Sequence, residues 1–74
     1  MEQNNVILSQ LQEFGKKLQM TRVSKGISQK KLSEMSGVAI STIRGVEKAS
    51  LIVKADTLIK IVKALGYRLT FELP

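Results

Sequence analysis

The sequence predicts an all-α domain of four helices followed by one C-terminal β-strand. Two observations lead to this prediction. Apolar residues recur at steps of three and four along four segments, which is the period of a helix with one buried face. From Tyr67 to Leu73 the period changes to two among β-forming residues, which is typical of a strand. We therefore divide the chain into a helical domain, residues 1–66, and a strand segment, residues 67–74.

The composition limits the class of function. The 74 residues include no cysteine and no histidine, which removes disulfides, thiolate metal sites and the usual general base. We therefore expect no enzyme, no metal and no cofactor. The apolar runs are too short to span a membrane, so we expect a cytoplasmic protein. Twelve Lys and Arg against six Asp and Glu give a formal charge of +6, which favours nucleic acid as the partner.

The first helix is predicted from about Asn5 to Lys25, with the first four residues outside it. Gly26 follows its last turn, where glycine commonly ends a helix. Steps of three and four place these residues on one face: Leu8, Leu11, Gly15, Leu18 and Arg22.

The second helix is predicted from Gln29 to Met35, with Ser28 as its N-cap. We expect Leu32 and Met35 to be buried. The helix stops at a tight turn that contains Gly37, and a third helix resumes directly after the turn.

The third helix, about residues 40–48, has two different faces at about 100° per residue. The core face carries Thr42, Ile43 and Val46, and the outward face carries Ile40, Ser41, Arg44 and Lys48. Two short helices around a tight turn form a helix-turn-helix unit, in which the second helix enters the DNA major groove. The alternative is an ordinary helical hairpin in a small bundle.

A fourth helix is predicted over residues 55–65, with Gly66 as its stop. Its buried residues are Leu58, Ile61, Val62 and Leu65. The loop before it contains Leu51, Ile52 and Val53, and three consecutive apolar residues suggest a packed or subunit-facing surface.

The central segment resembles the Cro/repressor-like helix-turn-helix family, also called XRE, which implies a lambda-repressor-like fold. The family pattern runs Gln-x-x-Leu-Ala-x-x-x-Gly-Val-Ser-x-x-x-Ile-x-x-Ile-Glu, and its direct matches are Gln29, Leu32, Gly37, Val38, Ile43 and Glu47. Ser33 replaces the alanine and Val46 the second isoleucine. The likeness covers residues 14–66. It departs at Ala39, where the family has a hydroxyl cap, and at Gly45, which weakens the helix by roughly 1 kcal/mol relative to alanine.

The facing of the third helix and the resemblance together assign base contacts to Ile40, Ser41 and Arg44. Arg44 can donate two hydrogen bonds to O6 and N7 of guanine, and Ser41 can donate or accept. Ile40 offers an apolar contact to a thymine methyl group, but the sequence leaves open whether it faces DNA or the core.

Phosphate contacts are expected from three residues. Gln29 lies at a helix N-terminus, where free N–H groups favour an anion. Lys48 and Lys54 flank the loop after the third helix; the alternative for these lysines is simple solvation. The resemblance also implies a structural ion pair between Arg22 and Glu47.

The C-terminal tail resembles that of HipB-type antitoxins, in which strands of two subunits pair. A single strand leaves its backbone groups unpaired, and only Val6–Leu8 offers a rival partner within the chain. We therefore expect a homodimer joined through Tyr67, Leu69, Phe71 and Leu73.

These inferences predict a repressor-like homodimer that binds a palindromic operator in double-stranded DNA. As an antitoxin it would also bind a kinase-like toxin. The alternatives are a stand-alone phage-type repressor and a protein-interaction module without DNA binding.

Overall fold

The computed structural model describes residues 2–70, and side chains from Asn5 onward. Four helices follow one another along this part of the chain: α1 (Glu2–Ser24), α2 (Gln29–Ser36), α3 (Ile40–Glu47) and α4 (Ala55–Ala64). The predicted all-helical domain of four helices is confirmed. α1 begins at Glu2 rather than at Asn5. No helix of the described residues has the length and apolar character needed to cross a membrane.

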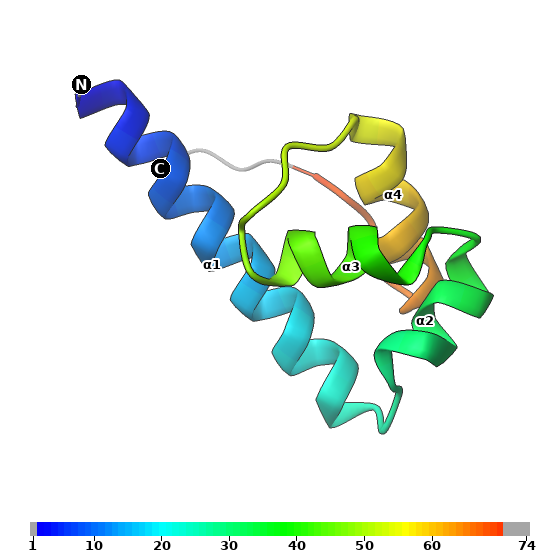
Figure 1. Cartoon of the computed structure of the whole chain (residues 1–74). Coiled ribbons are helices and arrows are strands. Elements are labelled where there is room, and N and C mark those ends of the chain that lie inside the picture. The colour runs from blue at the N-terminus through cyan, green and yellow to red at the C-terminus, as the bar shows by residue number, and fades with distance from the viewer. Residues whose placement is uncertain (1, 71–74) are drawn as a thin grey trace.

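The core lies where the four helices meet. α1 packs on α3, and α2 packs on both α3 and α4. Figure 1 shows this arrangement, with α3 lying across the middle of the long α1. The buried cluster consists of Leu18, Leu32, Val38, Ile43, Val46, Ile61 and Leu65.

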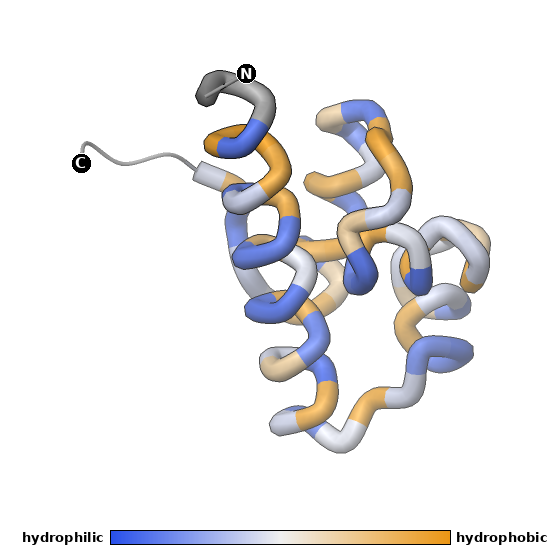
Figure 2. Tube along the Cα trace, turned by 60° about the vertical axis from the view of Figure 1, so that its left-hand side comes forward, coloured by the Kyte–Doolittle hydropathy of each residue, from blue (hydrophilic) through white to orange (hydrophobic). Residues whose placement is uncertain are grey.

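The N-terminal turns of α1 extend past this core (Figure 1). Val6, Ile7 and Leu8 are exposed, and Figure 2 shows their hydrophobic colour near the free end of the helix. The face of α1 that carries Leu8 is therefore buried only in its later turns. Periodicity places Leu8 on the same side of α1 as Gly15, but α3 crosses α1 at Gly15 and the earlier turns lie beyond that crossing.

The predicted burial of Met35 is wrong, since this side chain is 45% exposed. Leu32 is fully buried, but the rest of the inward face of α2 is polar and half-buried: Gln29, Ser33 and Ser36. At 100° per residue this face is centred away from Met35. The serines lie inward because they bond to the backbone of the following turn.

Three helices end in the same backbone pattern. The residue after the last turn has a left-handed φ, and two successive N–H groups bond back to carbonyls of that turn. In α1 and α4 the left-handed residue is Gly26 (φ 69°) and Gly66 (φ 86°). In α3 it is Ala49 (φ 56°), whose N–H and that of Ser50 bond to α3 carbonyls at 3.1 and 2.9 Å.

The start of the tail is attached to the helical domain. The N–H of Tyr67 bonds to the carbonyl of Val62 (2.9 Å), and the ammonium of Lys25 lies 5.4 Å from the Tyr67 ring centre. Residues 67–70 are neither helix nor strand. Phe71 and Leu73 lie outside the described residues, so the dimerisation strand stays a prediction.

Candidate nucleic-acid interface

The turn between α2 and α3 is held by its own side chains. Gly37 has a φ of 74°, and its N–H bonds to the Ser33 carbonyl at 2.9 Å. The hydroxyl of Ser33 donates to the Val38 carbonyl (2.6 Å), and that of Ser36 accepts from the Val38 N–H (3.2 Å). The two serines therefore fix the backbone from which α3 starts. Sequence reasoning recorded Ser33 only as a small residue and missed this role.

α3 presents one polar face to solvent. Ile43 and Val46 point into the core, whereas Ser41 and Arg44 are exposed. Ile40, at the first position of the helix, is half-buried. The short helix thus offers side chains of the kind that recognise base edges, while its apolar residues fasten it to the domain.

The predicted phosphate contacts occupy different surroundings. Lys48 is the C-cap of α3 and Lys54 the N-cap of α4, and both are exposed at the two ends of the connecting loop. Gln29 is half-buried at the start of α2, because its side chain turns toward α3. Within the loop, Ile52 is 91% exposed.

A buried ion pair lies directly behind the exposed face of α3. Arg22 donates from Nε to Oε2 of Glu47 (2.7 Å) and from Nη2 to Oε1 (3.1 Å). Its remaining nitrogen, Nη1, donates to the carbonyl of Ile27 at 2.8 Å. The side chains of the pair are only 9% and 3% exposed. One arginine thus ties the end of α1 to the entrance of α2 and to the end of α3.

Gln29 extends this network to the surface. Its Nε2 donates to Oε1 of Glu47 (3.1 Å), and its Oε1 accepts from Nε of Arg44 (3.2 Å). The amide therefore lies between the buried carboxylate and the exposed arginine. Sequence reasoning assigned Gln29 to phosphate and missed both bonds, because they depend on how α2 crosses α3.

Two glycines allow close approaches around α3. A Cβ on Gly15 would lie 2.7 Å from the carbonyl oxygen of Glu47 and nearer still to that of Val46. A Cβ on Gly45 would overlap the side chain of Leu51, which fills that space. Gly45 therefore accommodates the loop after α3, and α3 is continuous through it from Ile40 to Glu47.

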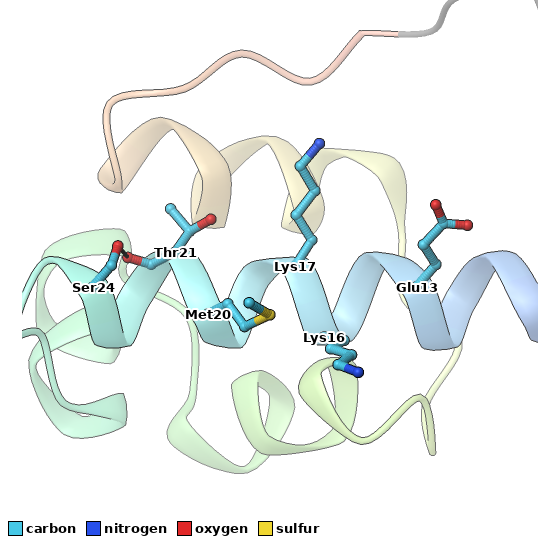
Figure 3. Close-up of a pocket in the computed structure, with 6 residues that line it drawn as sticks. All are labelled: Glu13, Lys16, Lys17, Met20, Thr21 and Ser24. Carbon is cyan, nitrogen blue, oxygen red and sulfur yellow. Dashed lines mark hydrogen bonds between the residues drawn. The ribbon is translucent and has the colours of Figure 1, made fainter.

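Three of the basic residues of α1 do not share one face. Figure 3 shows Lys16 and Lys17 pointing to opposite sides of α1, and Arg22 is buried in its ion pair. The shallow depression drawn there is lined by Glu13, Lys16, Lys17, Met20, Thr21 and Ser24. The hydrogen bond marked in it, from the Ser24 hydroxyl to the Thr21 carbonyl (2.8 Å), lies within the helix. Converging polar groups, which a ligand site needs, are absent from this depression.

Among the described residues, no group of three or more acidic side chains lies close enough together to hold a metal ion. The exposed face of α3, braced from behind by α1 and α2, is therefore the candidate site.

A glycine-containing turn between two short helices, the second with an exposed polar face, defines a helix-turn-helix domain. The chain belongs to the helix-turn-helix family, whose profile matches residues 18–71. It is similar to the crystal structure of the restriction-modification controller protein C.AhdI from Aeromonas hydrophila. The two share 34% sequence identity with a TM-score of 0.75, over 78% of this chain and 88% of that chain. No curated protein sequence matches the chain. The protein is thus a DNA-binding transcriptional regulator of the helix-turn-helix class.

Proposed function

We propose that the protein reads a specific operator by inserting α3 into the major groove. Ser41 and Arg44 contact base edges, and Ile40 lies against a thymine methyl group at the groove wall. Lys48 and Lys54 contact phosphates on either side of the loop. This proposal rests on the exposed face of α3. Ser41 and Arg44 face solvent, whereas Ile43 and Val46 on the opposite face are buried in the core.

Selection of binding sites from a random duplex pool tests the assignment. The wild-type protein should enrich one sequence, and Arg44→Ala should lose preference at one base pair of each half-site, by a factor that corresponds to about 1–3 kcal/mol per site. Lys63→Ala is the matched control, since Lys63 is exposed in the last turn of α4, outside α3 and the loop that follows it, and should enrich the wild-type sequence. Unchanged base preference in Arg44→Ala would refute base reading by this residue. Failure to bind any duplex at low salt would instead favour a protein-interaction module.

The operator should be a palindrome bound by a homodimer joined through residues 67–73. Two features of the described residues support this. Tyr67 and Leu69 expose 55% and 38% of their surface, and the tail forms one wall of a groove beside Phe14, Leu18, Val62 and Leu65. A second copy of the tail would cover this mostly apolar groove, which Lys17 and Thr21 also line. A two-fold dimer would place two α3 helices ~34 Å apart, one turn of B-DNA, or a multiple of that distance.

We propose two alternative genetic settings. Similarity to a restriction-modification controller protein, at 34% identity, favours control of restriction-modification genes. The alternating tail favours a HipB-type antitoxin that also binds a kinase-like toxin. Purification with the products of the adjacent genes separates them: an antitoxin should co-purify with its toxin, whereas a controller should bind only the promoter beside a methyltransferase or endonuclease gene.

A further inference from the structure

A chain of hydrogen bonds connects the core to the exposed Arg44. Arg22 donates to both carboxylate oxygens of Glu47, at 2.7 and 3.1 Å. Glu47 also accepts from the amide of Gln29 at 3.1 Å, and that amide accepts from Arg44 at 3.2 Å. Each link places a donor against an acceptor. The amide of Gln29 has only one favourable orientation, because turning it over would set its oxygen against a carboxylate and its NH₂ against a guanidinium.

We propose that Gln29 is a positioning residue that holds Arg44 ready for the guanine it reads. This inference rests on the proposed base-reading role of Arg44. It assigns Gln29 a role in sequence specificity, whereas a phosphate contact would contribute equally to every DNA sequence.

The atoms used by the network suit this role. Arg44 donates to Gln29 through Nε, which leaves Nη1 and Nη2 to donate together to O6 and N7 of guanine. An exposed arginine otherwise samples many rotamers, and fixing it opposes binding. A bond at Nε removes part of that freedom before DNA arrives. Gln29 is itself bonded to Glu47. The position of Arg44 therefore depends on the ion pair that joins α1 to α3.

Gln29→Met tests the proposal, because methionine has a similar length and no amide. Preference at the base pair read by Arg44 should fall roughly three- to tenfold, the loss of about one hydrogen bond, with other base pairs unaffected. The double variant Gln29→Met, Arg44→Ala should show the same base preference as Arg44→Ala alone. Lys48→Met is the matched control: it introduces the same side chain at a predicted phosphate contact and should weaken binding to all sequences alike.

A uniform loss in Gln29→Met, additive with Arg44→Ala, would overturn the positioning role and favour a phosphate contact. Failure of the proposed function gives a different result: Arg44→Ala itself would then leave base preference unchanged.

A second measurement uses the unaltered protein and does not depend on a variant folding. The three arginines are Arg22, Arg44 and Arg68, of which Arg22 is buried and Arg68 is exposed in the tail. Exchange of their Nε–H protons with water, followed by NMR in the free protein, should be slowest for Arg22 and fastest for Arg68. Arg44 should lie between them. Exchange at Arg44 as fast as at Arg68 would contradict the proposal.

Discussion

Arg22 donates to both carboxylate oxygens of Glu47, at 2.7 and 3.1 Å, and joins the end of α1 to the end of α3. Both side chains are buried, so either residue alone would leave an unpaired charge in the protein interior. Arg22→Met and Glu47→Met should each lower the free energy of unfolding by about 3–5 kcal/mol, and the double variant should lose much less than their sum. A double-mutant cycle on urea unfolding measures this coupling.

Glu34→Met, on the exposed side of α2, is the control and should change stability by no more than about 0.5 kcal/mol. Simple additivity of the two changes would show that the pair is not coupled.

Gly15 and Gly45 should respond differently to alanine. At Gly15 the new Cβ meets backbone carbonyls of α3, which cannot move without separating the helices, so we expect a loss of about 1–3 kcal/mol. At Gly45 the obstacle is the half-exposed Leu51 side chain, which can turn away. Alanine there also gains roughly 1 kcal/mol of helix propensity, so the net change should be small. Urea unfolding of the two variants tests the contrast, and equal losses would contradict it.

Ala49→Gly should stabilise the protein. Ala49 occupies the left-handed position at which α1 and α4 carry glycine, and this conformation costs a residue with a Cβ about 1–2 kcal/mol. Glycine removes that cost but adds about 0.4–1 kcal/mol of conformational freedom to the unfolded chain. The thermal midpoint should therefore rise modestly. Ala64→Gly, within α4, should lower it. A lower midpoint in Ala49→Gly would show that the residue is not strained.

The salt dependence of DNA binding should report the proposed phosphate contacts. Lys48→Met and Lys54→Met should each reduce the slope of log K against log salt concentration by about 0.9 per protomer, or about 1.8 for the homodimer, because each protomer releases one counterion fewer from duplex DNA. Lys63→Met removes the same charge from the last turn of α4, outside α3 and the loop that Lys48 and Lys54 flank, and should leave the slope unchanged. An unaltered slope in Lys48→Met would place this lysine outside the interface.

Removal of residues 67–74 should convert a dimer into a monomer with poor operator affinity. Sedimentation equilibrium on the intact and shortened chains measures this directly. A finer test exploits the period of two: Leu69→Ser should weaken the dimer, whereas Arg68→Ser, on the opposite face of the predicted strand, should not. An intact chain that sediments as a monomer at micromolar concentration would exclude the proposed interface.

The sequence predicts the helices well because their signals are local. Ser28 caps α2, with its hydroxyl accepting from the Lys31 N–H at 2.9 Å, and Gly26 and Gly66 follow helices that end where expected. Periodicity likewise identifies the core residues of α3 and α4. The exposure of Leu8 and the error at Met35 have a shared cause. Periodicity shows which residues lie on the same side of a helix but not how far a neighbouring helix covers that side.

The site is less accessible to sequence reasoning than the fold. Exposure of Ser41 and Arg44 follows from the facing of one helix. The bonds of Gln29 do not, because they join residues of different helices and depend on the crossing of α2 with α3. The close approach at Gly15 is likewise invisible in the sequence, where this glycine resembles any other residue on the inner face of α1.

The division between exposed and buried parts of the network bears on how operator preference can change during evolution. Ser41 and Arg44 lie at the surface, so exchanges there should alter the proposed base contacts with little effect on stability. Glu47 is bonded to Arg22, which joins it to α1, and to Gln29, which is bonded to Arg44. A change at Glu47 should therefore alter both the stability of the fold and the proposed DNA-contacting face of α3. Drift in DNA sequence preference should therefore proceed through the outer side chains of α3, while the carboxylate behind them is retained.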